Sequence, residues 1–235
     1  MARKAHQSLA GISLLSGISP SEVNYLERAC SWRRYGAKEQ IFDHDSEEND
    51  VYFVVDGSVQ ILNYSPSGRE ISFANVKTGG YFGELAALDG GTRSASVMAV
   101  EESTLASISS QAFRKLVLDH PEIAFEVLLN LTGMVRSADA RIMDLSTLSA
   151  INRVHTELLR MSSPTEPESN VGIIHPIPTH NDIASRAGTT RETVSRVLSN
   201  LTRVMIIERT SDALKVVDLR RLNDLIEPTG DLPAA

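Results

Sequence analysis

The spacing of the hydrophobic residues changes near Ser110, and this change constrains the fold more than any other feature. Between residues 40 and 109, short β-type runs alternate with turn signals such as Ser-Pro-Ser-Gly at 65–68 and Thr-Gly-Gly at 78–80. After Ser110, apolar residues recur at alternating intervals of three and four. The first pattern is typical of a β-roll or jelly-roll barrel, and the second of a long helix. The sequence therefore predicts an α+β chain in which a β-roll precedes a long helix.

Local signals place turns and a helix start in the first half. Asp56-Gly57 lies between the apolar runs 51–55 and 59–62 and is the strongest hairpin signal in the chain. A further β run, residues 95–109, is expected to close the barrel. Ser19-Pro20-Ser21-Glu22 predicts a capped helix start in the N-terminal portion.

The apolar residues after Ser110 follow the a/d spacing of a heptad seam. Two structures explain such a stripe: the helix packs against its own barrel, or it forms a coiled coil with a second copy of the chain. Strict 3-4 spacing favours the second, so we expect a homodimer. Gly133 lies inside this helix, at a cost of up to about 1 kcal/mol relative to Ala. The seam consists of Leu128, Leu131, Val135, Ala138, Ile142 and Leu145.

The composition is that of a soluble globular protein. The 235 residues, 42% hydrophobic and 23% charged, are enough for two domains. No run approaches the roughly 18 to 20 apolar residues that span a bilayer, and no signal-peptide-type stretch follows the N-terminus, so we expect a cytoplasmic protein with no membrane partner. Cys30 is the single cysteine, and the six histidines lack metal spacing, so no metal is expected. The formal net charge of -7 means that any nucleic-acid contact must come from a local basic surface.

Residues 81–97 place a carboxylate and a guanidinium around a glycine-flanked apolar turn. Gly83 lets the backbone approach an anion closely, and the amides after it can begin a short helix, whose start favours negative charge. Gly90 and Gly91 turn the chain back, so Arg93 returns opposite those amides and can pair with a phosphodiester oxygen. Glu84 can only accept when ionised, which suits a sugar hydroxyl. The pattern indicates a ribose-phosphate site; a glycine-rich hairpin with a surface Glu–Arg pair is the structural alternative.

Residues 179–198 have helix-turn-helix spacing. Thr179 can cap the first helix and Thr190 the second, with Gly188 in the turn. The exposed face of the second helix carries arginine, which suits the two major-groove acceptors of guanine, and glutamate, which can accept from the cytosine amino group. An exposed face of i,i+4 ion pairs is the alternative. Residues 206–217 are expected to form a β-wing beside this helix.

Together these motifs resemble the cAMP receptor protein and FNR family of bacterial transcription regulators. The resemblance covers most of the chain. It implies a cyclic-nucleotide-binding β-roll over residues 1–120, a dimerisation helix over 121–145 and a winged helix-turn-helix DNA-binding domain over 146–235, with 148–161 as its first helix. It also implies that Gly83, Glu84 and Leu85 contact the ribose and the cyclic phosphate. Arg93 and Ser94 are then expected to close on the phosphate.

The same resemblance implies how DNA is read. The family's Arg-Glu-x-x-x-Arg pattern is matched by Arg191, Glu192 and Arg196, and Ser195 also satisfies the FNR-type Glu-x-x-Ser-Arg pattern. Arg191 favours TGTGA-like half-sites in palindromic double-stranded DNA, because the FNR branch has an apolar residue there. Phosphate contacts are expected from His180, Thr189 and Thr190.

The implied allosteric ligand is a cyclic nucleotide whose base lies against the dimer helix. In cAMP-selective members a threonine–serine pair on this helix meets the adenine, and Ala138 and Asp139 stand there in this chain. Asp139 can accept from the N1 and N2 donors of guanine, and Ser94 adds a hydroxyl, so cGMP is expected beside or instead of cAMP. A solvated coiled-coil flank is the alternative for Asp139. A ligand that favours one arrangement of this helix would set the separation of two recognition helices.

Three rival functions are compatible with parts of this pattern. No catalysis is expected, because the Glu84–Arg93 couple has no adjacent nucleophile and no GxSxG, Walker-type or HExxH motif occurs. A purely signalling cyclic-nucleotide module would lack the helix-turn-helix. A regulator of the same fold that senses haem-bound gas or another small molecule, or that acts without ligand, stays open. RNA polymerase is a further candidate partner, with the loop at 164–170 as a positional candidate.

Overall fold

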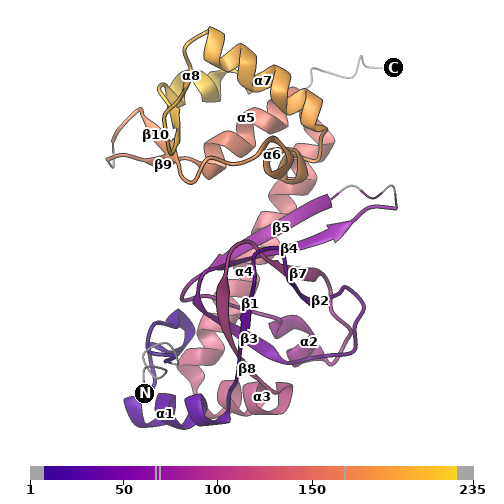
Figure 1. Cartoon of the computed structure of the whole chain (residues 1–235), viewed down its shortest axis with the longest axis vertical. Helices are drawn as coiled ribbons and strands as arrows, with labels where there is room; N and C mark the ends of the chain where they lie inside the picture. The colour runs from indigo at the N-terminus through magenta and orange to yellow at the C-terminus, as the bar shows by residue number, and fades with distance from the viewer. Residues whose placement is uncertain (1–7, 67, 69, 167, 227–235) are drawn as a thin grey trace. The chain divides into compact units, whose positions relative to one another are not determined.

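The computed structural model describes residues 8–66, 68, 70–166 and 168–226 (Figure 1). The chain forms two compact units, Met1–Met134 and Val135–Ala235, whose boundary lies inside helix α4, Pro121–Thr147. The ends of the expected ranges 1–120 and 146–235 fall partly outside the described residues, and the division into three functional parts stays a prediction. The α+β fold class itself is confirmed.

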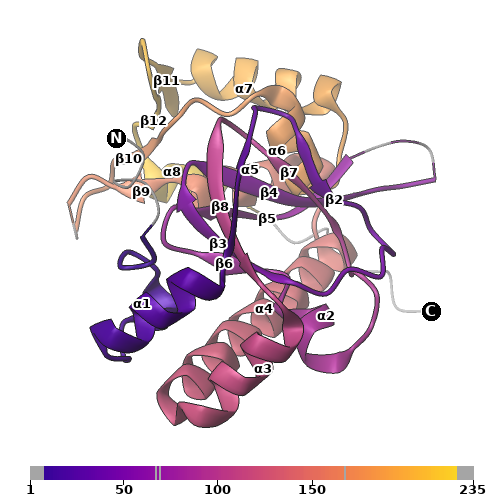
Figure 2. The same ribbon diagram turned by 60° about the horizontal axis from the view of Figure 1, so that its bottom comes forward.

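Two four-stranded antiparallel sheets build the first unit (Figure 2). One sheet has the strand order β1-β8-β3-β6, and the other has the order β2-β7-β4-β5. This is the expected β-roll. Its strands are β1 Ser31–Tyr35, β2 Gln40–Phe42, β3 Val51–Asp56, β4 Ser58–Tyr64, β5 Glu70–Lys77, β6 Tyr81–Phe82, β7 Ser96–Ala99 and β8 Ser103–Ile108.

The hairpin expected at Asp56-Gly57 is wrong. The flanking strands belong to different sheets, because β3 pairs with β6 and β8 whereas β4 pairs with β5 and β7. Gly57 has a φ of +87°, and a Cβ there would lie 2.4 Å from the Ser103 side chain, so only glycine fits where the chain crosses. The expected run 95–109 likewise divides into β7 and β8, one in each sheet. The local signal marks a tight turn, but strand pairing depends on burial far along the chain.

Alternating side chains of β3 build two cores in the first unit. Val51 and Phe53 point to a cluster with the helices, whereas Tyr52 and Val54 point to a cluster between the sheets. The helical side holds η1 Ser13–Leu15, α1 Pro20–Ala29, α3 Ser110–Asp119 and the start of α4. Helix α1 begins with the predicted capping box, because the Ser19 side chain accepts from the Glu22 amide and the Glu22 side chain accepts from the Ser19 amide.

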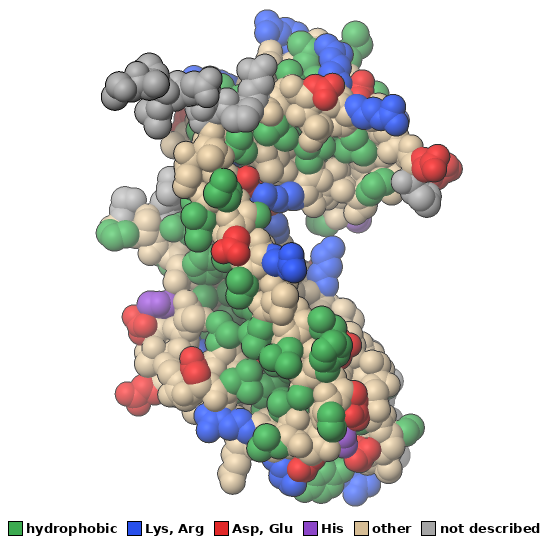
Figure 3. Space-filling view, turned by 180° about the vertical axis from the view of Figure 1, so that it is seen from behind, with side chains coloured by type: hydrophobic (Ala, Val, Ile, Leu, Met, Phe, Trp, Pro, Cys, Tyr) green, Lys and Arg blue, Asp and Glu red, His purple; other side chains and the backbone are tan. Residues whose placement is uncertain are grey.

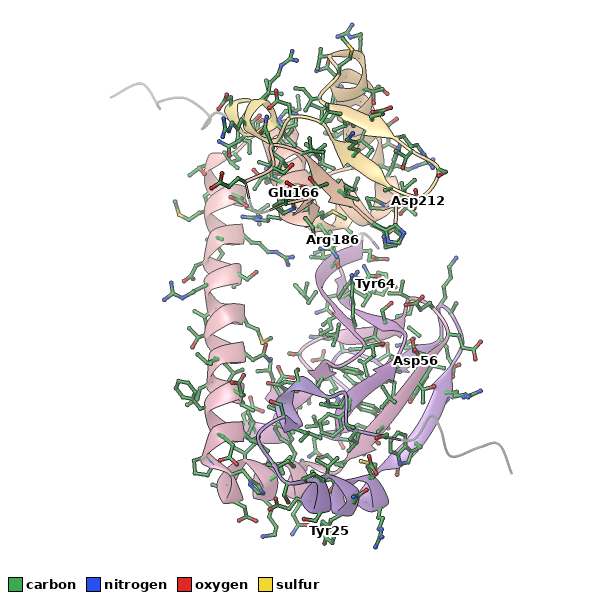
Figure 4. All side chains as sticks on the ribbon, turned by 90° about the vertical axis from the view of Figure 1, so that its left-hand side faces the viewer. Tyr25, Asp56, Tyr64, Glu166, Arg186 and Asp212 are labelled. Carbon is green, nitrogen blue, oxygen red and sulfur yellow. The ribbon has the colours of Figure 1, made fainter. Side chains whose placement is uncertain are left out.

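The second unit surrounds its own core with four helices and a small sheet. The helices after α4 are α5 Ala150–Met161, α6 His180–Ala187, α7 Arg191–Arg203 and α8 Leu219–Asp224. The sheet has the order β11-β12-β10-β9, from β9 Ser163–Pro164, β10 Gly172–Ile174, β11 Ile207–Arg209 and β12 Leu214–Val216. β11 and β12 form the predicted wing, with Asp212 at its turn (Figure 4). The core includes Val154, Leu158, Ile183, Val194, Leu201 and Leu222.

Helix α4 carries an exposed apolar stripe in the single chain (Figure 3). Leu128 is 59% exposed, so it does not pack against the barrel of its own unit. In the second unit, Val135 is 60% exposed and Ile142 61%. Leu131 is partly buried against the helical core of the first unit. Within the first unit, packing of the helix onto its own barrel therefore accounts for Leu131 and not for Leu128.

Candidate ligand-binding and DNA-binding sites

Helix α2, Glu84–Asp89, begins at a glycine that no other residue can replace. Gly83 has a φ of +89°, and a Cβ on it would lie 2.7 Å from Arg93 Nη1 and 2.9 Å from the Asp50 carbonyl oxygen. Gly90 ends the helix, also in the left-handed region, with a φ of +77°. Gly90 thus turns the chain back as predicted, and Gly83 lets the chain pass close to Arg93 and Asp50. The predicted approach of Gly83 to an anion stays a prediction.

Arg93 returns from this turn into the interior, where only 2% of it is exposed. Its Nη1 donates to the Gly83 carbonyl at 3.1 Å, and its Nη2 donates to the Asp50 carbonyl at 2.7 Å. Its Cζ lies 3.9 Å from the centroid of the Phe42 ring, a cation–π contact. Burial lowers the pKa of Arg93, although an arginine remains charged at neutral pH. The Nε is buried without a hydrogen-bond partner among the described residues.

Glu84 is buried beside Arg93, with 5% of the residue exposed. Burial raises the pKa of its carboxyl above 4.5, because desolvation disfavours the charged form, and its own amide and Arg93 offset this only in part. Both members of the couple are thus interior groups. The structural alternative of a surface Glu–Arg pair does not describe this region.

A small cavity of about 50 Å³ lies beside these side chains. Five predicted ligand residues come together along it, namely Gly83, Glu84, Leu85, Arg93 and Ser94. Its apolar walls, which the sequence interpretation missed, include Phe42, Ile61, Phe82, Val97 and Met134. Alternation along the strands could have assigned Ile61 and Val97 to an inner face, but no sequence signal marks Met134 on α4 as part of a pocket.

The other two predicted ligand residues lie in the second unit. Ala138 and Asp139 are both exposed on α4. Their predicted contact with a purine base therefore stays a prediction.

The helix-turn-helix forms with the predicted caps. The Thr179 side chain accepts from the Asp182 amide at the start of α6, and the Thr190 side chain accepts from the Thr193 amide at the start of α7. Gly188 ends α6 in the left-handed region, with a φ of +60°. The two helices share the core built around Ile183, Val194 and Val197.

The predicted DNA-contacting residues differ in accessibility. Thr190, Arg191, Glu192 and Arg196 are exposed, and His180 and Ser195 are half-buried. Thr189 is buried, with 7% exposed. Glu192 and Arg196 form no ion pair within the described part of the chain; instead, the Glu192 amide and the Thr190 side chain lower the pKa of the Glu192 carboxyl. The i,i+4 ion pair that the alternative interpretation expected between Glu192 and Arg196 is therefore absent from the described residues.

No helix within the described ranges is long and apolar enough to cross a membrane. Nor do the described residues bring together three or more His, Cys, Asp or Glu side chains that could share a metal ion.

Two family profiles match the two halves of the chain. The cyclic nucleotide-binding domain matches residues 32–120, and the Crp-like helix-turn-helix domain matches residues 152–225. These ranges contain the Gly83–Arg93 turn and the α6–α7 pair, respectively.

Whole-chain relatives agree with these profiles. The chain is 30% identical over 217 residues to the cyclic AMP receptor protein of Thermus thermophilus, covering 92% of this chain and 98% of the relative. It is 26% identical to a CRP-like cAMP-activated global transcriptional regulator of Mycobacterium tuberculosis, covering 91% and 96%. A CooA variant from Carboxydothermus hydrogenoformans, at 22% identity and a TM-score of 0.77 over 91% of this chain and 94% of that one, has the same fold. The chain therefore belongs to the cAMP receptor protein and FNR family of transcription regulators, which are DNA-binding proteins and not enzymes.

Proposed function

We propose that this protein is a cyclic-nucleotide-responsive transcription regulator that acts as a homodimer on palindromic DNA with TGTGA-like half-sites. Its ligand is cAMP, cGMP or both. The ligand part of this proposal depends on one observation: a buried guanidinium beside a helix-starting glycine, with a buried carboxylate next to it. A phosphate accepts from Arg93 and from amides near Gly83, and a ribose hydroxyl donates to Glu84.

The unpartnered Nε of Arg93 supports a phosphate at this place. A buried donor without an acceptor costs about 1–3 kcal/mol, and a phosphate oxygen would remove that cost. The cavity, at about 50 Å³, is far below the roughly 300 Å³ of a typical ligand pocket, so it accommodates only part of a nucleotide. The sugar phosphate would occupy this part, and the base would extend beyond it.

The identity of the base depends on Asp139. Its carboxylate can accept from the two guanine donors, which adenine lacks, and so cGMP should bind at least as well as cAMP. Calorimetric titration of both nucleotides into wild type and Asp139→Ala tests this. A cGMP affinity that does not change in the variant removes Asp139 from the site. Ala138→Ser provides the matched comparison, because it adds a hydroxyl one residue away.

The exposed stripe of α4 supports the dimer. Leu128, Val135 and Ile142 would meet their copies in a two-stranded coiled coil, which places two α7 helices about a two-fold axis. Sedimentation of the purified protein tests this, with Ile142→Glu expected to yield monomers. The predicted RNA polymerase contact at 164–170 includes residue 167, which lies outside the described residues, and it stays a prediction.

A second candidate function is regulation by another small molecule or without ligand. It is favoured by the small cavity and by the carbonyl groups that already occupy Nη1 and Nη2 of Arg93. Selection of random DNA by the purified protein, with and without each cyclic nucleotide, separates the two candidates. Selection of one palindrome with equal affinity in all conditions would retain the DNA-binding role and reject nucleotide control.

A further inference from the structure

One guanidinium on α5 holds three main-chain carbonyls of the second unit. Arg153 donates through Nε to Ala187 at 2.9 Å, through Nη1 to Leu148 at 2.9 Å and through Nη2 to Gly188 at 3.2 Å. Ala187 is the last residue of α6, and Gly188 is its cap. Leu148 lies in the link between α4 and α5. One side chain therefore joins the end of the long helix to the turn of the helix-turn-helix.

These bonds restrain a very short segment. Only Gly188, Thr189 and Thr190 separate α6 from α7, so the direction of the two carbonyls before and within this turn sets the direction in which α7 begins. The carbonyls at the end of a helix have no partner inside the helix, and an arginine there both satisfies them and complements the negative end of the helix dipole. Arg191 and Glu192, the first residues of α7, follow directly.

Two further kinds of contact, one apolar and one ionic, join the same elements. A Cβ on Gly188 would lie 3.2 Å from Leu145 Cδ2, so the last turns of α4 pack closely against the turn. A chain of charges runs alongside: Arg160 pairs with Asp144 of α4 at 2.6 Å and with the buried Glu157 at 3.9 Å. Glu157 in turn pairs with Arg186 of α6 at 3.4 Å (Figure 4 labels Arg186). The hydrogen bonds of Arg153, the apolar contact and the ion pairs therefore all restrain the position of α6 and its turn relative to α5 and the end of α4.

We infer that Arg153 is a positioning residue for DNA recognition: it makes the end of α4, α5 and the helix-turn-helix turn one rigid body, and so holds the start of α7 in the orientation that reads bases. Arg153 does not itself contact DNA. The inference rests on the proposed reading of DNA by α7 and is independent of the ligand. It also means that a movement of the end of α4 carries the recognition helix with it.

The test compares Arg153→Gln and Arg153→Lys with wild type on two duplexes. The first duplex is the one that wild type selects from random DNA, and the second is a scrambled version of it. Fluorescence anisotropy measures both affinities at several salt concentrations, under the nucleotide condition in which wild type binds most tightly. Arg34→Gln, an exposed arginine on β1, is the control for loss of one positive charge. Circular dichroism verifies that each variant is folded.

Arg153→Gln should bind the selected duplex about tenfold more weakly, or about 1.4 kcal/mol, while its affinity for the scrambled duplex stays within about twofold. The slope of affinity against salt should not change, because no phosphate contact is lost. The affinity of Arg153→Lys for the selected duplex should lie between those of wild type and Arg153→Gln. Its ammonium group keeps the charge but cannot reach three carbonyls as the wider guanidinium does. Arg34→Gln should behave as wild type.

Three results would overturn the inference. Unchanged affinity for the selected duplex would remove Arg153 from recognition. Equal losses on both duplexes, with a salt slope reduced by about one, would make it a direct phosphate contact. If neither variant folds, Arg153 is an element of stability and not of positioning. Failure of wild type to select any DNA would instead reject the proposed function.

Discussion

The guanidinium of Arg93 donates to the main-chain carbonyl of Gly83, with 3.1 Å between Nη1 and the oxygen. The arginine expected to hold a phosphate is therefore itself attached to the residue at which α2 begins. Because a Cβ on Gly83 would lie 2.7 Å from the same nitrogen, the glycine and the arginine require each other. The turn at Gly83 and the guanidinium of Arg93 therefore form one preorganised element.

Replacing Arg93 should abolish most nucleotide binding. Arg93→Lys keeps the charge but loses the planar fork, and we expect about a hundredfold weaker cAMP affinity, since hydrogen bonds to charged groups contribute about 1.5–3 kcal/mol each. Arg93→Ala should bind cAMP more weakly still. Its melting temperature should also be lower, because the carbonyls of Gly83 and Asp50 lose their donor. Calorimetry measures the affinity, and Arg34→Lys on β1 is the exposed control. Unchanged binding in both Arg93 variants would move the ligand elsewhere.

Glu84 should make stability depend on pH. Its pKa is raised above the usual 4.5 by burial, so the folded state holds the proton more tightly than the unfolded state, and the stability that this provides below 4.5 is lost as the pH rises through the raised pKa. Glu84→Gln does not titrate. The free energy of unfolding of the variant minus that of wild type should therefore increase with pH from 4.5 upward and then level off.

Urea unfolding at a series of pH values measures this difference. Glu39→Gln is the control of opposite sign: the Gly36 amide lowers the pKa of the Glu39 carboxyl, so the variant should lose stability relative to wild type as the pH rises toward 4.5. A difference for Glu84→Gln that stays constant from pH 4 to 8 would contradict the prediction.

Arg114 should stabilise helix α2, which follows Gly83, through a contact from α3. Its Nε donates to the carbonyl of Ala87 near the end of α2, at 2.5 Å. In Arg114→Gln we expect faster amide hydrogen exchange at Gly90 and a severalfold weaker cAMP affinity, because the last turn of α2 loses its charged cap. Lys115→Gln removes the same charge from the next residue, whose partner is Asp119, and should leave both measurements near wild type. Equal effects of the two variants would indicate a general charge effect.

Replacing Met205 by glycine should stabilise the folded protein. It follows α7 with a φ of +55°, where a side chain is disfavoured, and it is 78% exposed. Met205→Gly should raise the free energy of unfolding by about 0.5–1 kcal/mol. Gly188→Ala is the matched opposite, because its φ is +60° and the new Cβ would lie 3.2 Å from Leu145, and it should destabilise by more. Chemical denaturation measures both; a destabilised Met205→Gly variant would mean that the methionine side chain packs.

Short-range signals predicted a large part of this molecule. The Ser19, Thr179 and Thr190 caps act on amides only three residues away, and the structure has all three. The turns expected at Gly90 and Gly188 are present, and both residues, like Gly83, adopt the left-handed backbone conformation. The change of period near Ser110 also coincides with the end of the β-roll strands, because β8 ends at Ile108 and α3 starts at Ser110.

Asp56-Gly57 shows where such signals fail. A turn signal says that the chain reverses or bends, but the partners of β3 are β6 and β8, and β8 lies some fifty residues downstream along the chain. Which strands pair depends on how both faces of β3 are covered, since all of Val51 to Val54 is buried. No residue near the turn carries that information.

The amino-acid pattern was sufficient to identify caps, glycine turns and the two motifs, because each depends on atoms a few residues apart. The residues expected to meet a phosphate or a base stay a prediction. Folding alone decided that Arg93 and Glu84 are buried, that Met134 joins the pocket wall and that Arg153 reaches Leu148, Ala187 and Gly188. Burial and such distant hydrogen bonds arise from packing between elements far apart in the chain, and a linear pattern of residues does not specify which elements meet.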